Sequence, residues 1–163
     1  MKLKFIEPSD IETLMAIENA SFAEGARQSK EELLRTAGDK SRVGILALSD
    51  TGTPIGYVIG SPLENYDYTE DAQKSKNNTI YCESIAVMPE ERGKGIGTTL
   101  YATFLLEARK KGFERETDHA YKGRIGFREK FSPKILQELE NWYDDGQNAT
   151  YSEIDLKKLI KAE

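Results

Sequence analysis

The stretch from Thr79 to Lys111 constrains the fold of this chain more than any other. It reads as an apolar strand, a tight turn rich in glycine, and an amphipathic helix whose apolar residues recur every three or four positions. Gly93, Gly95 and Gly97 stand at alternate positions in the turn. Because glycine has no Cβ atom, such a turn lets a ligand approach the backbone closely.

A turn of this kind directs several backbone N–H groups into one space at the positive end of a helix. That arrangement binds anions, and phosphate groups above all. The spacing differs from G-x-G-x-x-G and from G-x-x-x-x-G-K-[ST], which excludes both of those phosphate loops. It fits R/Q-x-x-G-x-G/A instead, with Arg92, Gly95 and Gly97 in register. A turn that only reverses the chain is the structural alternative.

This pattern resembles the signature of the GCN5-related N-acetyltransferases (GNAT), whose loop holds the pyrophosphate of acetyl-coenzyme A (acetyl-CoA). The preceding segment Ser84–Pro89 is similar to the hydrophobic-x-Val-x-Pro ending of the family's fourth strand. The resemblance implies that Ile85 and Val87 bind the pantetheine arm. It also implies a pyrophosphate site formed by Arg92, Gly93, Lys94, Gly95, Gly97 and Thr98.

Length and composition indicate a single soluble domain over residues 1–163. No apolar run approaches the roughly 20 residues that cross a bilayer, so we expect a cytoplasmic protein without a membrane partner. A net charge of −5 without a basic cluster argues against nucleic acid. One cysteine and one histidine predict no disulfide and no metal site. Dimers are common among proteins similar to this one, so a homodimer is a further expectation.

The remaining elements follow the order that the resemblance implies. Serine-to-glutamate capping boxes at Ser9–Glu12 and Ser29–Glu32 predict two helix starts, and Asp50–Thr53 predicts a hairpin turn. The pair Ser132-Pro133 predicts a helix through Leu139, and a closing hairpin follows, from Trp142 to Leu156. The expected fold is an α/β (α+β) GNAT fold: a single mixed, mostly antiparallel central sheet flanked by helices.

Acetylation of an amine needs a base, because an alkyl amine with a pKa near 10.4 costs roughly 4–5 kcal/mol to deprotonate at pH 7. Strand alternation predicts that Tyr81, Glu83, Ile85 and Val87 share one face. Glu83 is then a carboxylate in an apolar strand beside the cofactor, and we predict that it is the general base. A carboxylate that pairs with a nearby lysine or arginine is the alternative.

The departing thiolate needs an acid, which in the resembled family is a tyrosine near a Gly-Phe pair. The segment Ala120–Phe127 places Tyr121 one position early, so Tyr121, Tyr143 and a water are the candidates. His119 is interpreted as a structural residue or a proton relay. Cys82 is interpreted as a core side chain.

The resulting hypothesis is an acetyl-CoA-dependent N-acetyltransferase that acts by direct attack in a ternary complex. The acceptor is a primary amine, either a small arylalkylamine or polyamine or an amine of a protein or peptide. A non-catalytic acyl-CoA sensor and a nucleotide-binding module are the alternatives. A polar insertion at residues 61–78 is interpreted as a lid or as a disordered loop.

Overall fold

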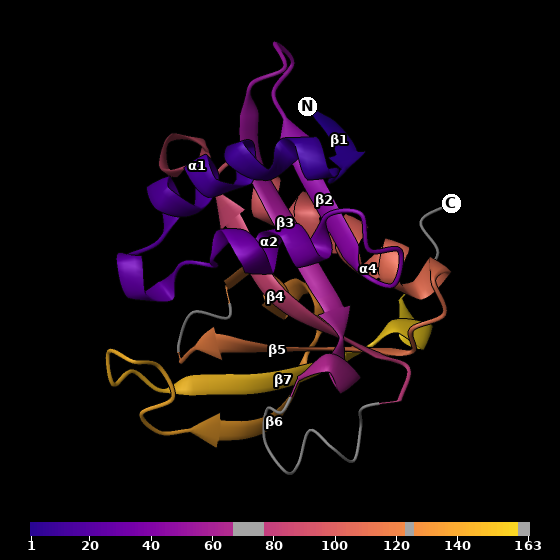
Figure 1. Cartoon of the computed structure of the whole chain (residues 1–163). Helices are drawn as coiled ribbons and strands as arrows, with labels where there is room; N and C mark the ends of the chain where they lie inside the picture. Colours follow the sequence, from indigo (N-terminus) through magenta and orange to yellow (C-terminus); the bar gives the residue numbers. More distant parts are fainter. Residues whose placement is uncertain (67–76, 123–125, 160–163) are drawn as a thin grey trace.

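A computed structural model describes residues 1–66, 77–122 and 126–159. Within these residues, seven strands form one sheet in the order β1-β2-β3-β4-β5-β7-β6 (Figure 1). Neighbouring strands are antiparallel except for β4 and β5, which run parallel. The predicted mixed, mostly antiparallel sheet is therefore confirmed. The strands are β1 (Lys2–Phe5), β2 (Val43–Leu48), β3 (Pro54–Pro62), β4 (Thr79–Val87), β5 (Arg115–Tyr121), β6 (Lys134–Leu139) and β7 (Ala149–Asp155).

Helices cover both faces of the sheet. Helices α1 (Ile11–Ser21) and α2 (Lys30–Thr36) lie on one face, and α4 (Ile96–Lys110) lies on the other (Figure 1). Short 3-10 turns connect these elements: Pro8–Asp10, Glu24–Ala26, Leu63–Asn65, Pro89–Glu91, Gly126–Phe131 and Leu156–Lys158.

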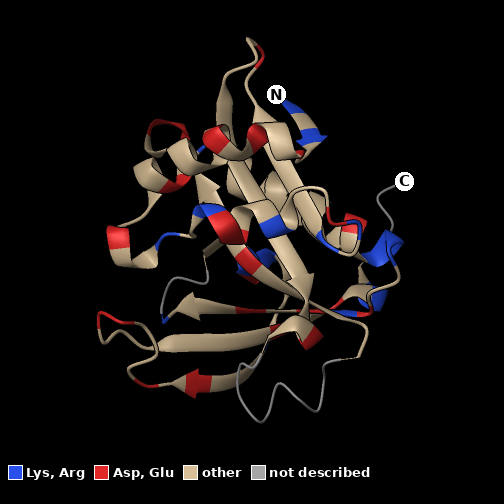
Figure 2. Ribbon diagram, in the orientation of Figure 1, with Lys and Arg blue, Asp and Glu red and all other residues tan. Residues whose placement is uncertain are grey.

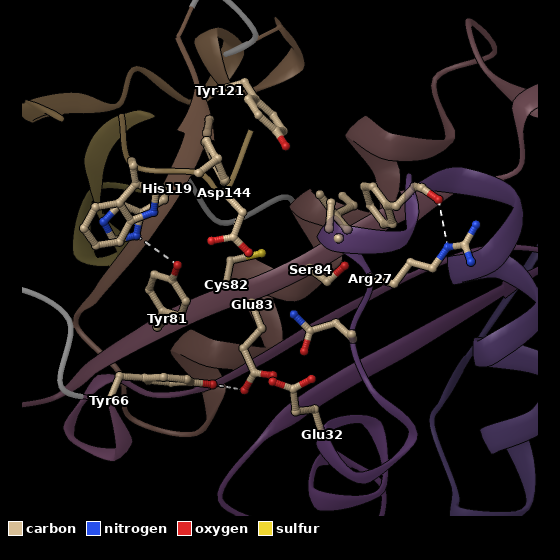
Figure 3. A pocket seen from close by; sticks show the side chains of 18 of the residues that line it. Arg27, Glu32, Tyr66, Tyr81, Cys82, Glu83, Ser84, His119, Tyr121 and Asp144 are labelled. Carbon is tan, nitrogen blue, oxygen red and sulfur yellow. Dashed lines mark hydrogen bonds between the residues drawn. The ribbon is translucent and has the colours of Figure 1, made fainter. Parts of the chain in front are cut away.

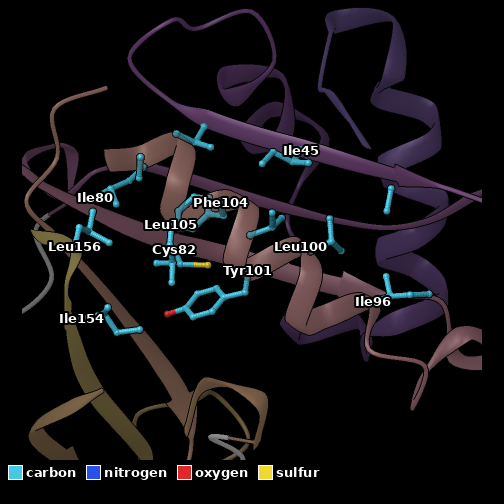
Figure 4. Close-up of a cluster of buried hydrophobic side chains, with 14 of the residues drawn as sticks. Ile45, Ile80, Cys82, Ile96, Leu100, Tyr101, Phe104, Leu105, Ile154 and Leu156 are labelled. Atoms are coloured by element: carbon cyan, nitrogen blue, oxygen red, sulfur yellow. The ribbon is translucent and has the colours of Figure 1, made fainter. Parts of the chain in front are cut away.

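The larger core lies between α4 and the sheet (Figure 4). The predicted apolar stripe of α4 is buried here, and Phe104 lies completely inside. Gly60 of β3 allows this packing, because a Cβ at Gly60 would lie 2.5 Å from the Phe104 ring. The core members of α4 are Ile96, Leu100, Tyr101, Phe104, Leu105 and Ala108.

A second core fills the opposite face, beneath α1 and α2. Leu14 and Ile17 of α1 and Leu33 of α2 pack there against Tyr57 and Ile59 of β3. All five side chains are almost completely buried. Burial of this kind stabilises each large side chain by about 1.5–3 kcal/mol, so it fixes α1 and α2 firmly on the sheet.

The two predicted capping boxes differ in outcome. At Ser29 the box is present, because the Glu32 amide donates to Ser29 Oγ at 3.2 Å and the Ser29 amide donates to Glu32 Oε2 at 2.7 Å. The Ser9 box is wrong. There the N-cap is Glu7, at the start of the 3-10 turn Pro8–Asp10 that precedes α1, and Asp10 Oδ2 accepts the amide of Glu7 at 2.9 Å.

The predicted helix after Ser132 is wrong, because Lys134–Leu139 forms the edge strand β6 and pairs with β7. Ser132 adopts a left-handed φ of 51° instead of the extended conformation of an N-cap. The closing hairpin consequently joins β6 to β7, and Trp142 and Tyr143 lie in its loop. The turn at Asp50–Thr53 is confirmed, with Gly52 at a φ of 85°.

Helix α2 has charged residues of both signs, and the tip of the β6–β7 loop is acidic (Figure 2). None of the described helices is long and apolar enough to cross a membrane. Residues 67–76, which make up most of the insertion interpreted as a lid or a disordered loop, lie outside the described part of the chain.

Candidate functional site

Strands β4 and β5 diverge halfway along their length. Their pairing begins at Thr79 and ends where Tyr81 faces Thr117. Beyond that point β4 continues beside β3 as far as Val87, and β5 continues beside β7 as far as Tyr121. The second half of β4 therefore has a strand on one side and an open edge on the other.

The open edge of β4 offers backbone hydrogen-bonding groups. Met88 donates its amide to Ile55 in β3 at 3.0 Å, which fixes the direction of the backbone groups that precede it in β4. Because neighbouring residues of an antiparallel strand point to opposite edges, Ile85 and Val87 direct their backbone groups away from β3. These are the two residues that the sequence predicts to bind the pantetheine arm.

The glycine turn leads from β4 into α4 as predicted. Gly93 and Gly95 have φ values of 77° and 82°, and Gly95 is the N-cap of the helix. The first helical bond runs from the Thr99 amide to the Gly95 carbonyl at 3.0 Å. The amides of residues 93–98 donate no hydrogen bond to another described group. Six N–H groups are thus available to an anion at the positive end of a fifteen-residue helix.

Two of the predicted phosphate residues have other partners. Arg92 donates from Nε to the Val87 carbonyl at 3.0 Å and from Nη2 to the Ser21 carbonyl at 3.3 Å. Its guanidinium thereby attaches the turn to β4 and to the end of α1. Lys94 Nζ forms an ion pair with Glu91 at 2.8 Å on the surface. An anion at this turn would therefore be bound mainly by backbone amides, with a smaller contribution from exposed positive side chains.

Gly97 and Thr98 lie in the first turn of α4. A Cβ at Gly97 would lie 3.4 Å from the ring of Phe127 and 3.8 Å from Val87 Cγ2. Glycine therefore allows the 3-10 turn that contains Phe127 to lie against the start of α4. Thr98 is half-buried, and its amide is one of the six described above.

A cavity of about 630 Å³ opens beside the divergence of β4 and β5 (Figure 3). The α1–α2 connection and α2 form one wall, and residues 82–85 of β4 line the middle. The end of β5 and the β6–β7 loop form the opposite wall, from which Asp144 points inward (Figure 3). The cavity thus adjoins the open edge of β4.

Glu83 occupies a β-bulge. Ile59 of β3 faces Ser84, whereas the next residue, Gly60, faces Cys82, so Glu83 is an extra residue in β4. A bulge changes which face the following side chains take. The prediction that Glu83 shares a face with Ile85 is therefore wrong.

The bulge directs Glu83 and Ser84 to the side of α1 and α2, while Ile85 and Val87 pack against the core beneath α4. The Glu83 carboxylate is almost completely buried, and one of its oxygens collects three donors. Arg42 Nη1 donates to Oε1 at 3.2 Å, and the hydroxyl of Ser61 donates to the same atom. The Tyr66 hydroxyl is the third donor to Oε1 (Figure 3).

A second carboxylate lies behind the same wall. Glu18 of α1 is completely buried, and its Oε1 accepts hydrogen bonds from Tyr57 and from Ser84 Oγ, the latter at 3.1 Å. Its Oε2 accepts the amide of Gln28 at 3.2 Å. Burial raises the pKa of the Glu18 carboxyl above its ordinary value.

Sequence reasoning missed Glu18, although a signal was present. Ile11, Leu14 and Met15 define the apolar side of α1, and Glu18 follows at the same helical spacing. A carboxylate on the buried face of a helix needs hydrogen-bond partners inside the protein. Asp144 was missed for another reason, since only the folded β6–β7 hairpin brings it to the cavity.

Aromatic rings form the wall opposite α2. His119 stacks on Trp142 with ring centroids 4.4 Å apart, and its Nδ1 lies 2.9 Å from the Tyr81 hydroxyl. Burial lowers the pKa of His119 to about 4, so its imidazole is neutral at pH 7. Tyr121 stacks on Tyr143 at 3.9 Å, and burial raises the pKa of Tyr143 to about 12. Tyr121 and Tyr143, the two candidate acids, are thus neighbours.

Cys82 is buried in the core as predicted, and burial raises the pKa of its thiol. A buried thiol that is held protonated is a poor nucleophile. In the described part of the chain, no group of three or more histidine, cysteine, aspartate or glutamate side chains could hold a metal ion. The remaining segment of the tyrosine motif, residues 123–125, lies outside the described residues.

Solved structures with the same fold include enzymes that act on protein amines. The ribosomal-protein-S18-alanine N-acetyltransferase of Escherichia coli is similar with a TM-score of 0.78 at 15% identity, over 99% of this chain and 97% of that one. NAA60 of Arabidopsis thaliana in complex with acetyl-CoA has a TM-score of 0.77 at 15% identity, over 96% and 98%. The yncA structure of Salmonella typhimurium with acetyl-CoA has a TM-score of 0.77 at 14% identity, over 96% and 94%.

At these identities the structural likeness shows the fold alone. A search of curated protein sequences gave no significant match. The family model of the acetyltransferase (GNAT) family, however, matches residues 11–132, which is most of the chain and includes the strand, the glycine turn and α4. The chain therefore belongs to the acetyltransferase (GNAT) family.

Proposed function

We propose that this protein transfers the acetyl group of acetyl-CoA to a primary amine by direct attack in a ternary complex. One observation carries the proposal: the open edge of β4 runs from a turn with six available amides to a cavity that contains carboxylates and tyrosines. A ligand laid along this edge places its phosphates at the turn and its far end in the cavity. That shape matches a coenzyme A thioester.

The cofactor end of the site acts through the backbone. The amides of residues 93–98 bind the pyrophosphate, and the open-edge groups of Ile85 together with the amide of Val87, whose carbonyl is bonded to Arg92, hold the pantetheine arm as a strand would. Acetyl-CoA supplies a thioester carbonyl that is open to nucleophilic attack. Because Arg92 fixes the turn to β4, the amides and the strand edge keep a constant relation to each other.

Glu83 is the proposed binding group for the amine. Its Oε1 already accepts hydrogen bonds from Arg42, Ser61 and Tyr66, so Oε2 remains for a positively charged ammonium group. Asp144 adds a second carboxylate from the opposite wall. These contacts favour one role of Glu83 over another. Glu83 would attract and orient the amine through its negative charge, and it would not be the general base.

Tyr121 is the proposed acid for the departing thiolate. It ends β5 and lines the cavity across from residues 82–85 of β4. Its ring is held by stacking on Tyr143, which fixes the direction of the hydroxyl. Tyr143 is the second candidate for this role.

A thiol-release assay with a panel of amines tests the function. The panel contains an arylalkylamine, a polyamine, a peptide with a free N-terminus, and the same peptide with an acetylated N-terminus and one lysine. At least one of these should raise CoA release about 100-fold over the rate without amine. Protein N-termini belong in the panel because the Escherichia coli structure is named for such a substrate.

A thermal-shift measurement separates the alternatives. Stabilisation by acetyl-CoA with no amine-dependent thiol release would identify an acyl-CoA sensor and sink the enzyme proposal. Stronger stabilisation by ATP than by coenzyme A would identify a nucleotide-binding module.

A further inference from the structure

Two neighbouring residues of β4, Glu83 and Ser84, connect the cavity with two different carboxylates. The bulge turns both Glu83 and Ser84 toward α1 and α2, and both residues line the cavity. Glu83 reaches the cavity with its own carboxylate. Ser84 reaches it with a hydroxyl that donates to the hidden carboxylate of Glu18 at 3.1 Å.

The hydroxyl of Ser84 is the link between Glu18 and the cavity. Glu18 has no exposed surface, so an acceptor in the cavity cannot touch it directly. Ser84 is half-buried, and its Oγ also lies 3.3 Å from the Tyr57 hydroxyl. Figure 3 shows the Ser84 side chain at the cavity wall, close to the loop that contains Arg27. A serine hydroxyl can accept a proton from one side while it donates its own to the other.

The two carboxylates differ in their hydrogen-bond partners. Glu83 Oε1 accepts from a guanidinium and from two hydroxyls, and Oε2 is the oxygen proposed to bind the ammonium group. Glu18 Oε1 accepts only hydroxyl groups, from Tyr57 and Ser84. No described cation forms an ion pair with Glu18.

We propose that the proton of the attacking amine passes through the Ser84 hydroxyl to Glu18, which makes Ser84 a catalytic residue and Glu18 the base that acts through it. This inference rests on the proposed acetyl transfer and deepens it. Glu83 then orients the amine, and Glu18 removes its proton.

The ammonium nitrogen first gives one proton to Ser84 Oγ while Ser84 gives its own proton to Glu18 Oε1, which frees the nitrogen lone pair. The neutral nitrogen then forms a bond to the acetyl carbonyl carbon, and the carbon–sulfur bond breaks with its electron pair on sulfur. The thiolate takes a proton from Tyr121, and the second proton that the nitrogen loses restores Tyr121. Glu18 afterwards releases its proton to solvent through Ser84, so an ammonium group and acetyl-CoA yield an amide, coenzyme A and one proton.

The surroundings of Glu18 suit a base, because they favour its taking up a proton more than water does. Burial raises its pKa, and the nearby Glu32 of α2 raises it further, whereas the Tyr57 hydrogen bond lowers it. Glu83 lies on the adjacent position of β4, and Arg27 of the α1–α2 connection directs its guanidinium to the carbonyls of Phe22 and Asn19. Because Glu18 must be ionised to accept a proton, activity should rise with pH through the Glu18 pKa.

The first test uses Ser84→Ala and Ser84→Thr, with the pH dependence of kcat/KM as the readout and the best amine of the panel as substrate. Ser84→Ala should lower kcat/KM about 100-fold at pH 7 and recover at alkaline pH, where the amine loses its proton to water. Ser84→Thr keeps the hydroxyl and should retain most of the activity. Both variants should bind acetyl-CoA as the unaltered protein does.

The second test moves the pKa of Glu18. Tyr57→Phe removes a donor to Glu18, so the acidic limb of the pH profile should shift to higher pH. Tyr101→Phe is the matched control, because Tyr101 donates to the buried Glu116 at 2.8 Å in a pair that does not line the cavity. The control should leave the limb in place.

The outcomes separate this inference from the proposed function. An unaltered protein that acetylates no amine overturns both. An active protein whose Ser84→Ala variant keeps its full rate, or loses activity equally at every pH, overturns the proton path alone. An acidic limb that moves in Glu83→Gln and not in Tyr57→Phe assigns the base to Glu83 and overturns it as well.

Discussion

The two halves of the cleft are built by different means. The cofactor half consists of backbone groups from one continuous stretch, the end of β4 and the glycine turn before α4. The acceptor half consists mainly of side chains from the α1–α2 connection, α2, β4, β5 and the β6–β7 loop. A site made of local backbone tolerates change elsewhere in the chain, whereas a site made of distant side chains depends on the whole fold. The four changes below address each half separately.

Gly95→Trp should produce the largest effect, which falls on the cofactor half. A side chain at φ 82° strains the backbone, and the indole would fill the space in front of the amides. We expect the Kd for acetyl-CoA to rise about 1,000-fold, measured by calorimetry. Gly52→Trp is the matched control, because Gly52 has a φ of 85° and open space in a remote turn.

Both tryptophan variants should lose about 1–3 kcal/mol of unfolding free energy from backbone strain. Only Gly95→Trp should lose the ligand. Equal acetyl-CoA affinity in the two variants would remove the phosphate site from the glycine turn.

Tyr121→Phe should lower kcat about 100-fold in the acceptor half and leave acetyl-CoA affinity unchanged. The ring keeps its stack on Tyr143, so the change removes the hydroxyl alone. Steady-state kinetics with the best amine measure the effect. Tyr143→Phe tests the neighbouring hydroxyl, and a larger loss there would transfer the role of acid to Tyr143.

Glu83→Gln should raise the KM for the amine about tenfold with little change in kcat, because it removes the negative charge that attracts the ammonium group. The amide keeps the shape of the side chain and its hydrogen bonds to Ser61 and Tyr66. Titration of the amine at saturating acetyl-CoA measures KM. A lower kcat at unchanged KM would contradict the orienting role.

Ser29→Ala should have the smallest effect, a loss of about 1 kcal/mol of unfolding free energy, because Ser29 caps the helix that forms one wall of the acceptor half. Ser9→Ala is the control. Ser9 is exposed and caps no helix, so its loss should stay within about 0.5 kcal/mol. Thermal unfolding monitored by circular dichroism compares the two, and equal losses would contradict the assigned cap.

The same contrast explains what the sequence could predict. The conformation of the glycine turn was predictable, since the left-handed φ values of Gly93 and Gly95 follow from local sequence, whereas the contacts of the Arg92 guanidinium with Val87 and Ser21 were not. The face of the sheet to which Glu83 points was not predictable, because no residue in the sequence of β4 signals the bulge. A bulge is set by how β3 pairs with β4, which is a property of two strands.

Strand β6 shows a second limit. Ile135, Leu136 and Leu139 fit helical spacing, and Ser132-Pro133 resembles a helix start, yet the segment pairs with β7 as an edge strand. Tertiary pairing overrides local preference in such short segments. Glu18 lies between these cases, because its place on the apolar stripe of α1 was visible and its link to Ser84 was not.

The guanidinium of Arg92 spans the boundary between the halves. It bonds at once to the last carbonyl of β4 and to Ser21, the residue with which α1 ends. The chain that leaves α1 at this point goes on to line the acceptor cavity. The Arg92 guanidinium thus ties the glycine turn to the chain that lines the acceptor cavity, so the loss of this one side chain would loosen both halves of the cleft.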